Sequence, residues 1–337
     1  MPSTFGNEYM ETSLWAWGLF HVMLFGMLAL DLGVFHRRSH VVGLREALAW
    51  SAAWIGLAML FNVGIYATMS AEASLQFLAG YVIEKSLSID NVFVFALIFG
   101  FFRVPAAYQH KVLVWGGLGA LVMRGIFIFA GIALIKQFHD VIYLFGALLV
   151  FSGFKMLMAK EAPFDPNANW IMRIARRFLR VSPQSDGDRF LTRLERGWAV
   201  TPLFLVLLFV ELTDVVFAID SIPAIMAVTM DPFLVYTSNA LAMLGMRSLY
   251  IALAGLLPRF VYLHHGLSAI LVFVGGKMLL GDFVKIPIAV SLTVITGILT
   301  VAIAASFWHR AAPKSPSVDE VPAEPLPLAL GDVKCIS

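Results

Sequence analysis

Two short polar stretches interrupt long apolar segments of this chain, and their side chains are of types that bind cations. The first is Glu84-Lys-Ser-Leu-Ser-Ile-Asp90-Asn91, and the second runs from Glu211-Leu-Thr-Asp214 to Ile219-Asp220-Ser221-Ile-Pro223. They contain five acids: Glu84, Asp90, Glu211, Asp214 and Asp220. An ionised carboxylate at the centre of a bilayer costs roughly 2.5–3.5 kcal/mol unless its charge is compensated. A bound cation is the compensation that we expect.

The oxygen donors of the two stretches favour a hard divalent ion. Carboxylates are joined by the amide of Asn91 and the hydroxyl of Ser221, and neither stretch contains histidine or cysteine. Pro223 is expected to kink its helix and to free the backbone carbonyl of Ile219. Such donors suit Mn²⁺, Ca²⁺ or Mg²⁺ and argue against Cu⁺ and Zn²⁺. We therefore predict a metal site formed by Glu84, Asp90, Asn91, Glu211, Asp214, Asp220 and Ser221.

The same acids have a second interpretation, a structural network in which they pair with Lys85, Arg124 and Arg247. Five acids exceed three cations, so we expect these three residues to compensate charge while the site holds no metal. Protons are then expected on part of the empty cluster, and an incoming divalent ion would release them. Metal/proton exchange follows as a hypothesis, with protons as the counter-ion.

The sequence gives no sign of an enzyme, of an organic cofactor or of nucleic acid as a partner. It has no Ser/His/Asp constellation, no His-Glu-x-x-His and no phosphate-binding loop. An intramembrane hydrolase could use paired acids, but the hydroxyls and further acids beside Asp90 and Asp214 fit cation coordination better. The formal net charge is only +2, which gives no reason to expect nucleic acid. The one cysteine, Cys335, leaves no disulfide framework and no thiolate metal site.

The elements that must position these residues are membrane-spanning helices. The 337 residues are 60% hydrophobic and 14% charged, whereas soluble domains are about half apolar and a quarter charged. We predict an all-α polytopic membrane protein, embedded in a lipid bilayer, with about nine transmembrane helices. The predicted spans are 14–35, 47–69, 75–101, 111–135, 141–159, 202–228, 232–256, 264–281 and 287–309.

The distribution of basic residues predicts the orientation. Most Lys and Arg outside the spans fall on one side of the membrane, and only Lys136 and Lys285 fall on the other. Because basic residues favour the cytoplasmic side, we expect the N-terminus outside and the C-terminus inside, in the inner or plasma membrane. The first 13 residues contain Glu8 and Glu11 but no Lys or Arg, unlike a cleaved signal peptide.

The chain also resembles itself. Ala147–Met158 matches Ala269–Leu280, Met123-Arg124 matches Met246-Arg247, and Asp90-Asn-Val-Phe matches Asp214-Val-Val-Phe, at offsets of 122 to 124 residues. Each unit holds three spans. Because three is an odd number of crossings, the second unit has the opposite orientation in the membrane. The pattern therefore predicts an inverted three-plus-three helix repeat, whose substrate site lies near the midplane on interrupted helices.

These observations give a division of the chain into six parts. They are an N-terminal part with two spans (1–70), a first repeat unit (71–159), a basic cytoplasmic loop (160–200), a second, inverted unit (201–283), a last span (284–310) and a disordered tail (311–337). Within the loop, Trp170 to Leu179 is either a short amphipathic helix on anionic headgroups or part of a solvated segment.

The two acidic stretches together resemble a known family. Glu84-Lys-Ser-Leu-Ser-Ile-Asp90-Asn-Val-Phe-Val-Phe, paired with Val210-Glu-Leu-Thr-Asp214-Val-Val-Phe-Ala-Ile-Asp220-Ser-Ile-Pro-Ala, is similar to the TerC family of integral membrane proteins, in particular its Alx-like, nine-span branch. The likeness runs from about residue 14 to 309. It implies kinship with LysE-type exporters, manganese export from the bacterial cytoplasm and an association with tellurite resistance. The family's acidic motifs fall on Glu84, Asp90, Asn91, Glu211, Asp214, Asp220 and Ser221.

The expected function is export of a divalent cation by a secondary transporter. The residues indicate a hard cation, whereas Mn²⁺ as the specific ion depends on the family resemblance. The alternative is a non-transporting membrane scaffold that hands metal to secretion machinery or docks with it. Cellular metal content distinguishes the two, because overproduction of an exporter lowers total Mn²⁺ and a scaffold leaves it unchanged.

Overall fold

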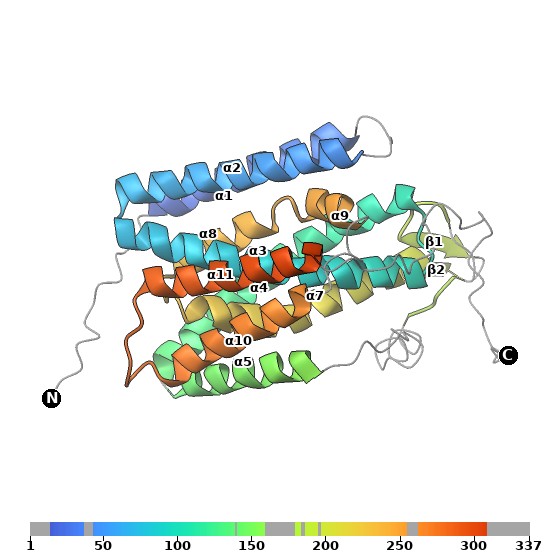
Figure 1. Cartoon of the computed structure of the whole chain (residues 1–337). Helices are drawn as coiled ribbons and strands as arrows, with labels where there is room; N and C mark the ends of the chain where they lie inside the picture. The colour runs from blue at the N-terminus through green and yellow to red at the C-terminus, as the bar shows by residue number, and fades with distance from the viewer. Residues whose placement is uncertain are drawn as a thin grey trace.

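The computed structural model describes residues 14–36, 43–138, 140–158, 179–182, 186–194, 197–254 and 262–308. This part of the chain is a bundle of α-helices with one small two-stranded sheet (Figure 1). The helices are α1 (Leu14–His36), α2 (Leu44–Thr68), α3 (Ala71–Phe101), α4 (Ala106–Gln137), α5 (Val141–Met158), α7 (Pro202–Met226), α8 (Pro232–Met243), α9 (Met246–Ala254), α10 (Leu263–Leu279) and α11 (Ile288–Trp308).

The helices lie where hydropathy predicts them, with one exception. The single helix predicted over 232–256 is divided into α8 and α9. Among the described residues, α2, α4, α5, α7 and α11 are long and apolar enough to cross a membrane, and α1 and α10 hold shorter apolar stretches. The long helix α3 is the one that carries Glu84, Lys85 and Asp90 within its length. The chain is thus a multi-pass, all-helical membrane protein; nine crossings and the inverted repeat stay predictions.

Side-chain caps explain where three of the helices begin. The hydroxyl of Ser70 accepts the backbone N–H of Ala73 at the start of α3, and Thr201 caps α7 in the same way. Asp231 caps α8 by accepting two backbone N–H groups. Proline follows both Thr201 and Asp231. At the first position of a helix a backbone N–H would have no acceptor within the helix, so proline, which lacks this group, is tolerated there. The kink expected at Pro223 falls in the last turn of α7, which ends at Met226.

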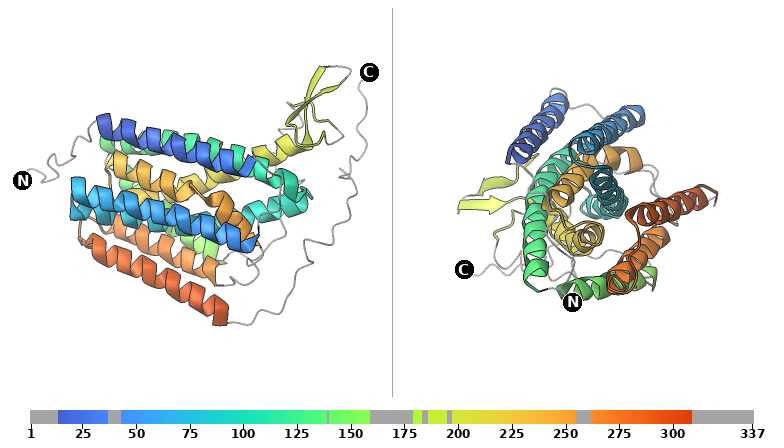
Figure 2. Two further views of the ribbon diagram at one scale, coloured as in Figure 1. Left: turned by 90° about the horizontal axis from the view of Figure 1, so that it is seen from above. Right: turned by 90° about the vertical axis from the view of Figure 1, so that its left-hand side faces the viewer.

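The end-on view in Figure 2 places α3, α7 and α8 inside the bundle, with α1, α2, α4, α5 and α11 around them. In agreement, α3 packs along α8 and α7, and α7 packs along α4. Large apolar side chains cover the outside, as Leu60, Val122 and Phe151 illustrate. An apolar exterior around a helical bundle is what contact with lipid tails requires.

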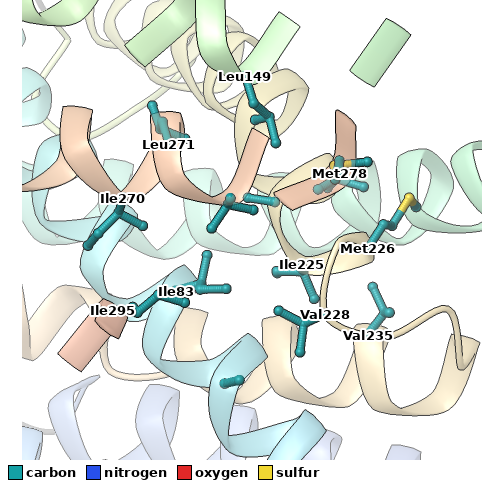
Figure 3. Packing of buried hydrophobic residues seen from close by; sticks show 14 of the residues in the cluster. Ile83, Leu149, Ile225, Met226, Val228, Val235, Ile270, Leu271, Met278 and Ile295 are labelled. Atoms are coloured by element: carbon teal, nitrogen blue, oxygen red, sulfur yellow. The ribbon is translucent and has the colours of Figure 1, made fainter. Parts of the chain in front are cut away.

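An apolar core joins the inner helices to α5, α10 and α11. Figure 3 shows Ile83, Leu149, Ile225, Ile270 and Ile295 converging from five different helices. Ile83 directly precedes Glu84 in the chain. The first acidic stretch is therefore anchored in a dry, close-packed region, which restricts how far its backbone can move.

The seam between α5 and α10 is built by glycines in close approach. A Cβ atom added to Gly153 would lie 2.7 Å from Cγ2 of Val272, and one added to Gly275 would lie 2.9 Å from Cγ2 of Val150. Small residues at helix contacts let backbones approach closely, which stabilises helix pairs in membranes. The internal sequence match pairs Gly153 with Gly275 and Val150 with Val272. Each glycine therefore packs against the valine that matches the other glycine's valine neighbour.

The segment 160–200 contains a β-hairpin that the sequence did not predict. Strands β1 (Leu191–Leu194) and β2 (Gly197–Val200) pair antiparallel. Lys111 of α4 holds the preceding loop, with its Nζ 2.9 Å from a carboxylate oxygen of Asp188 and 5.1 Å from the centre of the Phe190 ring. The amphipathic helix considered for Trp170 to Leu179 and the tail at 311–337 lie, except for Leu179, outside the described residues.

Candidate functional site

A buried arginine lies between two buried carboxylates at the contact of α3, α4 and α7. Arg124 is 1% exposed. Its Nη1 donates to Oε1 of Glu84 and, at 3.2 Å, to the hydroxyl of Ser221. Its Nε and Nη2 donate to the two oxygens of Asp214 at 3.3 and 3.2 Å. One guanidinium therefore neutralises part of the charge of two acids on different helices.

Helical periodicity explains how α3 contributes to this cluster. Glu84, Ser88 and Asn91 follow one another at i, i+4 and i+7, so they share a face, and all three are buried. The Ser88 hydroxyl lies 3.5 Å from Oε1 of Glu84, and Nδ2 of Asn91 donates to Oδ1 of Asp214 at 3.3 Å. This face of α3 is thus turned toward α7, whose Asp214 and Ser221 are seven residues apart on one face.

Asn239 of α8 completes the cluster, although the sequence analysis did not single it out. Its Nδ2 donates to Oε2 of Glu84 at 3.0 Å. The only sequence signal was an amide within an apolar segment, at a position that turns out to be 1% exposed. The Oδ1 atoms of Asn91 and Asn239 are both buried and have no hydrogen-bond partner in the described part of the chain. Two amide carbonyl oxygens beside the two carboxylates thus lack hydrogen-bond partners in the described structure. Buried polar atoms without a hydrogen-bond partner are rare.

The cluster is not a ready metal site. Within the residues that the structure describes, no three Asp, Glu, His or Cys side chains converge as a metal-binding group. Arg124 instead fills the space between Glu84 and Asp214. Two carboxylates and one guanidinium leave one negative charge when all three are ionised. Such a buried arrangement is stable only while every partner is present, because an unpaired buried charge costs several kcal/mol.

Three predicted ligands make other contacts. Asp220 accepts a hydrogen bond from the hydroxyl of Ser152 at 2.8 Å. Asp90 lies near the imidazole of His264 on α10. Glu211 lies directly over Gly119 of α4, where an added Cβ would overlap its carboxylate. The structure therefore gathers Glu84, Asn91, Asp214 and Ser221 around Arg124 and leaves these three acids outside that group.

The other two predicted compensating cations lie elsewhere. Nζ of Lys85 donates to the backbone carbonyl of Ala242, in the last turn of α8, at 3.1 Å. Arg247, on α9, is buried, and its Nη1 lies 2.7 Å from Nε2 of His110 on α4. Arg124 is thus the basic side chain that the structure places between the acids.

Comparison with known proteins identifies the family. The model of the integral membrane protein TerC family matches residues 69–314. An uncharacterised membrane protein of Myxococcus xanthus is 51% identical over 300 residues, covering 89% of this chain and 94% of that protein. Alx of Escherichia coli, for which the role of a membrane-bound redox modulator has been proposed, is 47% identical over 301 residues, covering 87% and 94%. No solved structure matches. The chain belongs to the TerC family of integral membrane proteins.

Proposed function

We propose that this protein is a secondary transporter that exports a divalent metal cation, with Mn²⁺ as the ion and protons as the counter-ion. The observation that carries the proposal is the buried Glu84–Arg124–Asp214 cluster. Buried acids within membrane helices mark ion pathways. Here a basic side chain occupies the position that a transported cation would take between the two carboxylates.

The oxygen donors around Arg124 suit the proposed ion. Glu84 and Asp214 supply carboxylate oxygens, and Asn91 and Asn239 each hold an amide oxygen without a partner in the described structure. Carboxylates and carbonyls are the ligands that Mn²⁺, Mg²⁺ and Ca²⁺ prefer. A divalent ion that reaches this position repels the guanidinium, so Arg124 withdraws as the ion binds. Arg124 thereby acts as a tethered counter-ion that neutralises the acids between transport events.

An inverted repeat supplies a means of alternating access. Asp214 matches Asp90, the neighbour of Asn91, in the internal sequence match, and Asn91 donates a hydrogen bond to Asp214. On α5 and α10, Gly146 faces Met278 while Gly153 faces Ser268, so these matching helices run antiparallel. The contact between the two matching stretches and the antiparallel direction of α5 and α10 both support two inverted units. In that architecture the substrate site lies at the interface of the units.

The positive-inside bias supports an inner or plasma membrane protein with its N-terminus outside and its C-terminus in the cytoplasm. The family name supports a change in tellurite tolerance when the protein is lost. The 337 residues contain one cysteine, so they cannot form a disulfide within the chain.

The test is simultaneous measurement of Mn²⁺ flux and internal pH in proteoliposomes. The wild-type protein should move Mn²⁺ against a counter-flow of protons, and Asp214→Asn and Glu84→Gln should abolish the flux. Asp140→Asn is the matched control, since Asp140 is an exposed acid outside the cluster.

Each outcome separates one interpretation from another. Full transport by Asp214→Asn would refute the central site. Mn²⁺ flux that neither moves protons nor responds to a collapsed pH gradient would remove the exchange and leave uniport. Correctly folded wild-type protein that moves no divalent ion would favour the non-transporting scaffold.

A further inference from the structure

The helix that carries Asn239 ends abruptly, at a glycine that no other residue could replace without strain. α8 ends at Met243 and α9 begins at Met246, and Figure 1 shows the chain turning between them. Gly245 has φ +77°, a left-handed conformation that favours glycine. A Cβ atom there would also lie 2.6 Å from Cδ1 of Trp54 on α2. Backbone conformation and packing therefore both require glycine at this break.

Two consecutive residues of α3 hold the last turn of α8. Glu84 accepts from Nδ2 of Asn239 at 3.0 Å, and Nζ of Lys85 donates to the carbonyl of Ala242 at 3.1 Å. Asn239 and Ala242 are three residues apart, so they lie on the same side of α8. The last carbonyls of a helix have no partner within it, and a cation near them is favoured by the helix dipole. Lys85 is thus a cap for α8 as well as a neighbour of the acids.

Beyond the break, the side-chain hydrogen bonds go to helices other than α3. The hydroxyl of Ser51 on α2 donates to that of Ser248 at 3.1 Å, and Arg247 contacts His110 of α4. Close to the break, the polar contacts of α8 therefore go to α3 and the Arg124 cluster, whereas those of α9 go to α2 and α4; α3 packs against both helices. Gly245 lies between these two attachments, where a small rotation can be absorbed.

We propose that Lys85 and Asn239 are positioning residues that couple cation occupancy of the Glu84–Asp214 site to movement at the α8–α9 break. The inference rests on the proposed function. A cation that binds Glu84 takes away the acceptor of Asn239, which then turns its unpartnered Oδ1 toward the ion. The last turn of α8 shifts with Asn239, the Lys85 contact to Ala242 is released, and Gly245 absorbs the change. Broken helices at a midplane site serve transporters in this way.

Amide hydrogen exchange of the full-length protein in nanodiscs tests the coupling. Two amides next to the break report on it: that of Leu244, bonded to the carbonyl of Ala240 at 3.1 Å, and that of Leu249, bonded to the carbonyl of Gly245 at 2.9 Å. Saturating Mn²⁺ should make peptides covering 240–249 exchange about tenfold faster, as the loss of a charge-assisted hydrogen bond implies. Peptides from α11 should not change.

Substitutions assign the effect to the two residues. Lys85→Met should exchange about tenfold faster at 240–249 without metal and respond little to Mn²⁺. Lys85→Arg should restore protection, because it keeps a donor and a charge. Asn239→Leu should leave the metal-free exchange low and remove the Mn²⁺ response. Lys277→Met is the matched control, a partly buried lysine on α10.

The outcomes distinguish failure of the coupling from failure of the transport proposal. Calorimetric binding of Mn²⁺ with unchanged exchange at the break overturns the coupling and leaves the metal site standing. No Mn²⁺ binding at all overturns both. Wild-type exchange in Lys85→Met overturns the role of Lys85. Should that variant fail to fold, the comparison of wild-type protein with and without Mn²⁺ decides alone.

Discussion

Arg124 holds Asp214 by two hydrogen bonds, one from Nε and one from Nη2, to the two oxygens of a single carboxylate. This paired geometry fixes the plane of the guanidinium and leaves Nη1 free to reach Glu84 and Ser221. A lysine offers a single charged point and could not make the same arrangement. The arginine therefore sets the spacing of the two acids while no metal is bound.

Replacement of Arg124 should make stability depend on metal. Arg124→Met removes the compensating charge, and breaking a buried ion pair costs about 3–5 kcal/mol of the free energy of unfolding. We expect a lower melting temperature in EDTA and a larger recovery with Mn²⁺ than the wild-type protein shows. Scanning fluorimetry in both buffers measures this, with the exposed Arg193→Met as control. An equal response of Arg124→Met and wild type to Mn²⁺ would contradict a shared cation position.

The acids outside the Arg124 cluster should matter less for binding than those within it. Asp214→Asn removes a charged ligand, so the dissociation constant for Mn²⁺ should rise at least about tenfold. Asp220 is instead bonded to Ser152, and Asp220→Asn keeps that contact, so binding should stay near the wild-type value. Isothermal calorimetry on the purified variants provides the comparison. An equal loss in both variants would place Asp220 in the cation path.

Gly119 should be needed for the position of Glu211. Gly119→Ala puts a methyl group where the carboxylate of Glu211 lies, so α4 and α7 must separate or Glu211 must move. Overpacking of this kind costs about 1–3 kcal/mol, and we expect a lower melting temperature. Gly117→Ala is a close control, since a Cβ there meets nothing within 4 Å. Identical behaviour of the two alanine variants would show that Glu211 moves freely.

The attachment of the hairpin to α4 should weaken in acid. The hydrogen bond and the charge of Lys111 lower the pKa of Asp188, so the folded state holds this proton less tightly than the unfolded state does. The stabilisation of the folded state by the Lys111–Asp188 ion pair is therefore fully present above the pKa of an unfolded Asp, about 3.9. It is lost as the pH falls through the lower pKa that Asp188 has in the folded state. The difference in melting temperature between wild type and Lys111→Met should accordingly shrink below pH 4. A difference that does not vary with pH would exclude this ion pair as its cause.

Much of the architecture follows from hydropathy and periodicity. Apolar length predicts the positions of the helices, and the spacing of Glu84 and Asn91 predicts their shared face. Periodicity does not say which neighbour a face meets. For this reason the sequence grouped Asp90, Glu211 and Asp220 with the Arg124 cluster, although none of the three takes part in its hydrogen bonds.

The break between α8 and α9 and the hairpin had weak local signals. Between residues 233 and 254, Gly245 is the one glycine and there is no proline, a pattern that continuous helices also tolerate. Gly245 also packs against Trp54, a contact between distant parts of the chain that local sequence does not reveal. The hairpin strands have four residues each; β1 is mostly exposed, and β2 buries two adjacent residues, Ala199 and Val200, so no apolar alternation marks them.

The one guanidinium between two carboxylates has a consequence for membrane voltage. With all three groups ionised the cluster carries one negative charge, and a bound divalent ion changes this to one positive charge. In the proposed exporter, an inside-negative potential would oppose both the outward step of the loaded site and the inward return of the empty one, by about 2.3 kcal/mol per elementary charge for each 100 mV. Two protons taken up for the return would reverse the sign of the empty site and let the voltage drive it inward.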